Sequence, residues 1–244
     1  WAQMIDIING HGKEEDGRRL YPHMYGDNGW YAYSTAPYSE GAREIYYWTL
    51  RQEDGKRVGR EGGSFFEERS PQHPERVFRN ILGWVQSRLE AMRRDPTTPQ
   101  TRLSDDPMVY NPVMVGHLVQ LMLGGLPPGR TLVAAPLHCQ VRYFDPVRRR
   151  AGIAEDVAAL VEAMNADGIV LRLINTNQGE SREVVVQGGA YGEHQFLRAV
   201  SSGEEVAVDG PFFTVRLAPG AGVQLELSMR RYANQPTLTF PWDR

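Results

Sequence analysis

The hydrophobic pattern of this chain changes its period partway along the sequence. In the first half, apolar residues recur at three- and four-residue steps, most clearly over residues 74–94. Pro74 stands at a first-turn position there, and Arg93 and Arg94 complement the carboxyl end of the helix dipole. In the second half, apolar and polar residues alternate, as in a strand with two different faces. The clearest alternating run is Val223, Leu225, Leu227 and Met229. Helices that precede strands in this way predict an α+β fold.

Further elements follow from the same patterns. Residues 1–9 read as a helix closed by Asn9 and Gly10, and a second helix is expected over residues 40–53. The segment between these two helices is predicted as a loop. A helix that runs up to Gly124 is apolar on every side, so we expect it to be buried on every side. A short helix is also predicted over residues 154–165, from the spacing of Val157, Leu160, Val161 and Met164.

The strand pattern starts at residues 137–144 and becomes continuous from Ile169. Turn residues such as Pro219-Gly220 separate the runs, and short strands at regular spacing predict an antiparallel β-sandwich. We therefore expect a helical region at 1–130, a connecting strand and helix at 131–165, and the β-sandwich at 166–244. The boundary is placed in the Pro/Gly-rich break near 126–136.

Composition excludes several classes of function. Lys and Arg total 27 against 30 Asp and Glu, so no basic excess favours nucleic acid as a partner. The longest apolar run, around Val113–Leu123, is too short to cross a membrane. The lone Cys139 allows neither an internal disulfide nor a thiolate zinc site, and the motifs of metal and nucleotide binding are missing. The sequence thus predicts a soluble protein without metal or cofactor; it leaves the compartment open and favours the cytoplasm.

Aromatic residues gather in one segment near the amino end. Of the chain's 11 tyrosines, seven lie between residues 21 and 47, interrupted by Gly26, Gly29 and Pro37. Flat rings can stack on the apolar face of a sugar while amides bind its hydroxyls, which predicts a carbohydrate site. Alternatively, these aromatic residues plug one end of a helical barrel. The expected substrate-binding residues are Tyr25, Asn28, Trp30, Tyr31, Tyr33 and Tyr38.

Acid–base candidates lie in the same segment. Asp27 ranks first, because glycine neighbours and aromatic surroundings favour a partly dry setting in which the pKa of a carboxyl can rise. His23 is the next choice, as a proton donor or a hydroxyl partner, and Glu40 is a further upstream carboxylate. Cleavage of a glycosidic bond needs two carboxyl groups, which sequence alone cannot pair. The remaining carboxylates considered are Glu44, Asp105 and Asp106.

The order of elements, together with the aromatic and acidic segment Tyr21–Glu40, resembles the final portion of bacterial carbohydrate-active enzymes that join an α/α toroid to a β-sandwich. This resemblance implies that residues 21–48 line a sugar cleft and that the protein is glycoside hydrolase-like. The visible helices are too few for a complete toroid. Helices upstream of Trp1, or a second chain, are therefore expected to complete the barrel.

Three functions stay open at this point. The first is a glycan-cleaving enzyme, or a fragment of one, with Asp27 as general acid/base. The second is a toroid lyase or isomerase that uses Tyr25, Tyr31 and His23 as acid and base. The third is a noncatalytic module whose sandwich binds a carbohydrate or a protein partner. The end of that sandwich carries the aromatic residues Tyr232, Phe240 and Trp242.

Overall fold

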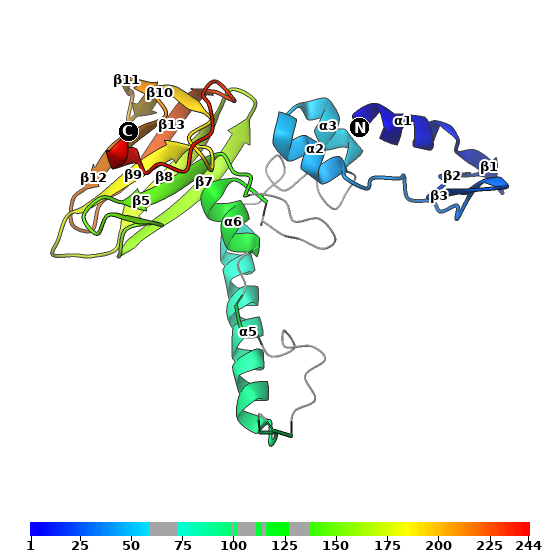
Figure 1. The fold of residues 1–244 in the computed structure, drawn as a ribbon, viewed down its shortest axis with the longest axis horizontal. Helices are drawn as coiled ribbons and strands as arrows, with labels where there is room; N and C mark the ends of the chain where they lie inside the picture. Colours follow the sequence, from blue (N-terminus) through cyan, green and yellow to red (C-terminus); the bar gives the residue numbers. More distant parts are fainter. Residues whose placement is uncertain (59–72, 99, 102–110, 114–115, 127–136) are drawn as a thin grey trace.

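The computed structural model describes residues 1–58, 73–98, 100–101, 111–113, 116–126 and 137–244. In these residues most helices lie in the first half and most strands, all antiparallel, lie in the second, which confirms the predicted α+β class (Figure 1). No described helix is both long enough and apolar enough to cross a membrane. Asp105, Asp106 and most of the expected boundary near 126–136 lie outside the described residues.

The described helices of the first half agree in part with the sequence pattern. They are α1 (Ala2–Gly10), α2 (Ala42–Thr49), α3 (Gln52–Arg57), α5 (His73–Arg94) and α6 (Gly116–Leu123). The single helix expected over residues 40–53 is wrong, because Leu50 adopts a left-handed φ of 51° that ends α2, and α3 starts two residues later. The burial expected on all sides of α6 is also wrong: only Leu121 is fully buried in it, and His117 is exposed.

The segment predicted as a loop contains two short hairpins. Strand β1 (Lys13–Glu15) pairs with β2 (Arg18–Leu20), and β3 (Met24–Gly26) pairs with β4 (Gly29–Tyr31), both antiparallel. Each hairpin has a glycine at positive φ in or directly after its turn, Gly17 at 70° and Gly29 at 89°. The segment predicted as a loop therefore forms two β-hairpins, because its turn residues favour them.

The strands of the second half form two antiparallel sheets (Figure 1). One has five strands in the order β11-β10-β13-β8-β7, and the other has four in the order β12-β9-β5-β6. Their bounds are β5 (Val141–Asp145), β6 (Arg150–Ala151), β7 (Val157–Asn165), β8 (Gly168–Asn175), β9 (Arg182–Gly188), β10 (Gln195–Ser201), β11 (Glu204–Gly210), β12 (Phe212–Leu217) and β13 (Gly222–Arg230). A 3-10 turn, Pro241–Asp243, follows near the carboxyl end.

The predicted alternation places one face of each sheet in the core. In β13, Leu225 and Leu227 are buried while Gln224 and Glu226 are exposed. Residues from both sheets, among them Leu171 of β8 and Val184 of β9, belong to a single buried cluster, as do residues of α1 and α2. Burial of this apolar surface is the main favourable contribution to the stability of the sheets.

The helix expected over residues 154–165 is wrong, because this segment is strand β7. It pairs with β8 in an antiparallel register that places Val157 opposite Asn175 and Val161 opposite Leu171, with one irregularity between Val161 and Ala163. The side chain of Asn165 closes the hairpin, since its Oδ1 accepts backbone N–H groups of Asp167 at 2.9 Å and Gly168 at 3.0 Å. The two sheets consequently include β5 and β7, which precede residue 166, the expected start of the sandwich.

Candidate functional site

The predicted site residues lie in and next to the hairpin of β3 and β4, residues Met24–Tyr31, here called the aromatic hairpin. Asp27 and Asn28 form its turn, and both are exposed. Asp27 is thus not in the partly dry setting that its sequence neighbours favour. The reason is that glycines on both sides place it at a protruding hairpin tip.

Trp30 is the centre of the aromatic hairpin. Its ring stacks on His11 with centroids 5.1 Å apart and meets the edge of Tyr25 at 4.9 Å. Tyr25 and Tyr31 are largely exposed, at 69% and 51% of their surfaces. In the hairpin, Trp30 therefore contacts the rings of His11 and Tyr25, while the rings of Tyr25 and Tyr31 face solvent. His11 is a further contributor that was not among the predicted site residues.

A second group of predicted residues surrounds Tyr38. The Tyr38 hydroxyl donates to Glu40 at 2.9 Å, and the ring of His23 lies 5.8 Å from the Tyr38 ring. Burial, followed by the hydrogen bond to Glu40, raises the pKa of Tyr38. Asn9, at the end of α1, holds this residue by two hydrogen bonds to its backbone, of 2.8 and 3.0 Å.

His23 and Tyr33 have local partners. Nε2 of His23 lies 3.0 Å from the carbonyl oxygen of Ala36 and 3.0 Å from the hydroxyl of Ser34. The ammonium group of Lys13 lies over the Tyr33 ring, 4.7 Å from its centroid. The structure thus gathers His23, Tyr38 and Glu40 in one group and places Asp27 at the tip of the neighbouring hairpin.

A different polar cluster, which sequence reasoning missed, joins α2 to the sheets. The guanidinium of Arg231, just after β13, donates to the carbonyl oxygens of Thr49 at 2.9 Å, Trp48 at 2.8 Å and Tyr47 at 3.1 Å. These are carbonyls at the carboxyl end of α2, where a helix has free acceptors and favours a positive charge. We call this cluster, together with its aromatic and histidine neighbours Tyr232, His138 and His194, the α2 joint.

Aromatic and histidine side chains complete the α2 joint. The hydroxyl of Tyr232 donates to the Trp48 carbonyl at 3.0 Å, and the Trp48 ring covers both Tyr232 and His138, at 5.7 and 4.5 Å. Because that hydroxyl is already a donor, Nε2 of His138 donates to it at 3.0 Å. The backbone N–H of Tyr232 donates to Nδ1 of His194 at 3.1 Å. Each histidine is therefore fixed in one neutral tautomer.

Burial next to a cation keeps both histidines neutral. Desolvation, then the charge of Arg231, lowers the pKa of His138 to about 4, and the same two causes lower the pKa of His194 to about 3. Nδ1 of His138 and Nε2 of His194 are buried and accept or donate no hydrogen bond among the described residues. Because these nitrogens do not reach solvent, the α2 joint is suited to holding the helices on the sheets rather than to binding a substrate.

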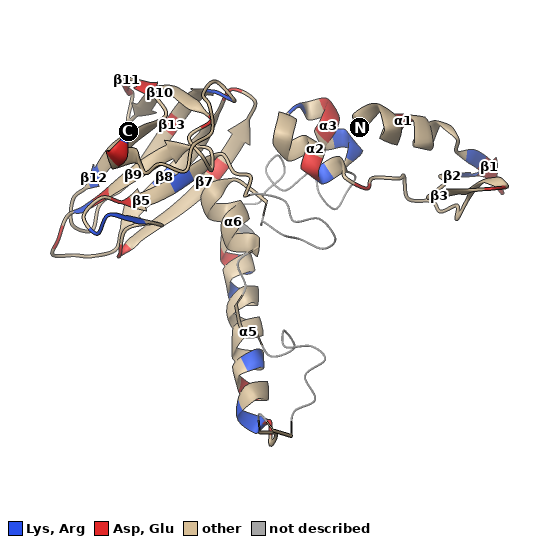
Figure 2. Ribbon diagram, in the orientation of Figure 1, with Lys and Arg blue, Asp and Glu red and all other residues tan. Residues whose placement is uncertain are grey.

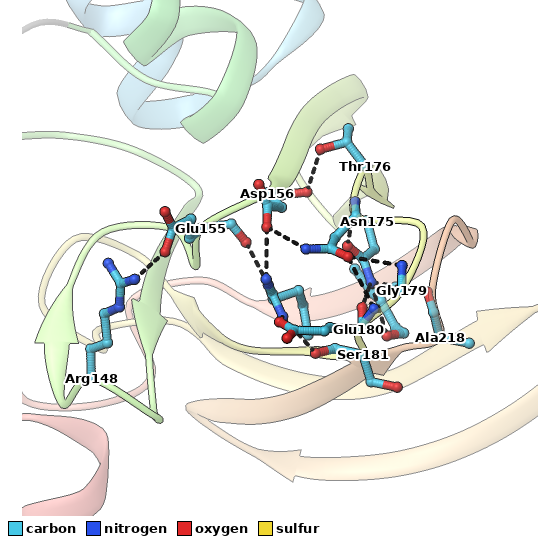
Figure 3. A network of polar contacts seen from close by, with 12 residues as sticks. Arg148, Glu155, Asp156, Asn175, Thr176, Gly179, Glu180, Ser181 and Ala218 are labelled. Atoms are coloured by element: carbon cyan, nitrogen blue, oxygen red, sulfur yellow. Dashed lines mark hydrogen bonds and ion pairs between the residues drawn. The ribbon is translucent and has the colours of Figure 1, made fainter.

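A network of polar loops lies at one end of the sheets (Figure 3). Asp156 accepts from Arg182 at 2.7 Å and from Asn177 at 2.9 Å, and the buried Asn175 donates to the carbonyl oxygens of Glu180 and Ala218. The network borders an open pocket of about 460 Å³. Arg148 and Arg182 on its wall are ion-paired with Glu155, Asp156 and Glu180, so they stabilise these loops instead of presenting free charge.

The part of the chain that the structure describes offers little support for a metal site or a reactive thiol. No group of three or more His, Cys, Asp and Glu side chains there could hold a metal ion. Burial raises the pKa of Cys139, which makes its thiol a poor nucleophile. Comparison of the chain with protein-family models, curated proteins and solved structures finds no match.

Proposed function

We propose that the aromatic hairpin is a carbohydrate-binding surface and that the chain is part of a glycan-active protein. The observation that carries this proposal is the Trp30 ring, held between His11 and Tyr25, beside the exposed rings of Tyr25 and Tyr31. Because Trp30 contacts the Tyr25 ring, the exposed Tyr25 can stack on the apolar face of a sugar with little further loss of side-chain freedom.

Polar groups at the tip of the hairpin complement these rings. Asn28 offers both a donor and an acceptor, and the carboxylate of Asp27 offers acceptors. Sugar hydroxyls need partners of this kind around an aromatic platform, which favours a carbohydrate over a purely apolar ligand. The hairpin is therefore better suited to a glycan than to a lipid.

We also propose that the layout is that of a partial α/α toroid followed by a β-sandwich. Two features favour it: residues of both antiparallel sheets share one buried cluster, and the helices precede the sheets along the chain. In this layout, further helices or a second chain complete the toroid, and the aromatic hairpin lines one side of the cleft.

Cleavage of a glycosidic bond stays a prediction that builds on binding. Asp27 would act as general acid/base, with His23 and Glu40 in the neighbouring group around Tyr38. Hydrolysis needs a second carboxyl group across the sugar. The variant Asp27→Asn is the direct test, because under this prediction turnover is lost while sugar binding persists.

Binding is tested by affinity electrophoresis in gels that contain neutral or acidic polysaccharides. Tyr25→Ala removes an exposed ring and should weaken binding by about fivefold, which corresponds to about 1 kcal/mol for one stacked ring. Trp30→Ala should weaken it more, because the ring also orients Tyr25. Trp84→Ala, on α5, is the matched control and should leave binding unchanged. If every polysaccharide that slows the migration of the parent protein slows Tyr25→Ala and Trp30→Ala to the same extent, the aromatic hairpin is not the binding surface.

A further inference from the structure

Helix α5 carries an apolar stripe that remains exposed. Phe78, Leu82, Leu89 and Met92 expose 40%, 58%, 37% and 48% of their surfaces, and the half-buried Val85 lies in line with them. Large apolar side chains arranged in a continuous exposed row mark an interaction surface more often than scattered ones do. We call this row the α5 seam.

The α5 seam is separate from the side of α5 that is already covered. Val77 is buried, and Ile81 and Trp84 are half-buried, on an adjacent face of the helix. No described helix or strand makes an extensive contact with α5, and Figure 1 shows it projecting away from the two sheets. The seam therefore adds a second apolar face to a helix that already has one.

The spacing of the α5 seam is that of a coiled coil. Its residues follow one another at steps of four, three, four and three, which assigns Leu82 and Leu89 to the a positions of a heptad. Phe78, Val85 and Met92 then occupy the d positions. A strict a/d row is narrow, and it fits one partner helix better than it fits a lipid surface, which needs a broader apolar face.

Three of the five positions beside the seam are arginines. The flanking e and g positions are Arg79, Ile81, Gln86, Arg88 and Arg93, with no acidic residue among them. Figure 2 shows Lys and Arg colour at several places along α5. A second copy of α5 would bring arginines against arginines in either direction, which disfavours self-pairing.

We propose that α5 docks an amphipathic helix of a partner protein, with apolar residues along its seam and glutamates at its flanks. Apolar a and d side chains of the partner would cover Leu82 and Leu89. Its glutamates would pair with Arg88 and Arg93, so the charges would select the partner and the seam would supply most of the affinity.

The test uses the full chain and two synthetic helical peptides with leucine at a and d, one with glutamate and one with lysine at e and g. Calorimetric titration should detect the glutamate peptide and show at least tenfold weaker binding of the lysine peptide. Leu82→Asn combined with Leu89→Asn should weaken binding of the glutamate peptide by at least tenfold. The matched control, Asn80→Ala with Ser87→Ala on the opposite face, should not.

Charge reversal adds a gain-of-function arm. Arg88→Glu combined with Arg93→Glu should reverse the preference, so that the lysine peptide binds more tightly than the glutamate peptide. Circular dichroism establishes that each variant keeps its helix content. Four outcomes would overturn the proposal. The first two are equal affinity for both peptides and absence of binding. The others are a dimer of the chain that Leu82→Asn dissociates, and binding to anionic vesicles but not to the glutamate peptide.

Discussion

Acidification should destabilise this protein through two buried histidines of the α2 joint. In the unfolded chain a histidine takes up a proton near pH 6.5. In the folded protein the pKa of His138 is about 4 and that of His194 about 3, because both rings are desolvated and face the charge of Arg231. Their other close neighbours are Tyr232 and Glu193, which do not offset this effect. As the pH falls below 6.5, the two histidines bind protons in the unfolded state but not in the folded state, so the free energy of unfolding decreases.

The size of the effect follows from linkage. Between about pH 7 and about pH 5, each histidine should cost about 2 kcal/mol of unfolding free energy, and the two together about 4 kcal/mol. That is a large part of the 5–15 kcal/mol of stability that is typical of a domain. Asp and Glu contribute little to this slope, because their ordinary pKa values lie below this interval.

Urea unfolding followed by circular dichroism, repeated at several pH values, measures this slope. His138→Gln keeps a donor where Nε2 stood, and His194→Asn keeps an acceptor where Nδ1 stood. Each variant should remove about half of the slope and the pair nearly all of it. His117→Asn, at an exposed position of α6, should leave the slope as in the parent. A double variant that still loses about 4 kcal/mol over this interval would show that other groups carry the pH dependence.

Three further changes should destabilise the fold, each checked by urea unfolding at neutral pH. Arg231→Met leaves the last carbonyls of α2 without their donor and should cost about 2–4 kcal/mol, and a loss below about 0.5 kcal/mol would refute the role of the α2 joint. Asn175→Ala removes a fully buried amide that donates to two loop carbonyls and should cost about 2–3 kcal/mol; an unchanged midpoint would mean that the loops hold without it. Gly168→Ala would place a Cβ 2.1 Å from the carbonyl oxygen of Leu227, so it should prevent or strongly destabilise folding. Gly10→Ala, where a Cβ meets no atom within 4 Å, is its control and should be near neutral.

Local patterns predicted those elements whose period is unambiguous. Helix α5 has its proline, glutamate and arginines where the helix dipole favours them, and β13 alternates without interruption. Residues 154–165 lacked such clarity, because Val157 and Val161 satisfy a four-residue helical step and also fall on one face of a strand. Pairing with β8 decides between the two readings, and that pairing is a tertiary interaction that spacing within one segment does not contain.

The α2 joint could not be predicted for a related reason. Arg231 and the carbonyl oxygen of Trp48 are 183 residues apart, and neither belongs to a motif. The only signal in the sequence was an arginine and a tyrosine directly after a clear strand, which is common at strand ends. The three carbonyls at the end of a helix needed a donor, but sequence does not say which distant side chain supplies it.

The sequence allows two interpretations of the aromatic segment, a carbohydrate site or packing residues at the end of a barrel. Burial assigns different residues to each interpretation. Tyr46 and Tyr47, on α2, are buried in the cluster that also contains residues of the sheets, so they pack as structural residues. Tyr25 and Tyr31, on the aromatic hairpin, face solvent. A tyrosine that only packs has little reason to expose most of its ring, because exposure forfeits the hydrophobic gain. The exposed pair is therefore where a ligand should be sought, and substitution of the buried pair should lower stability rather than affinity.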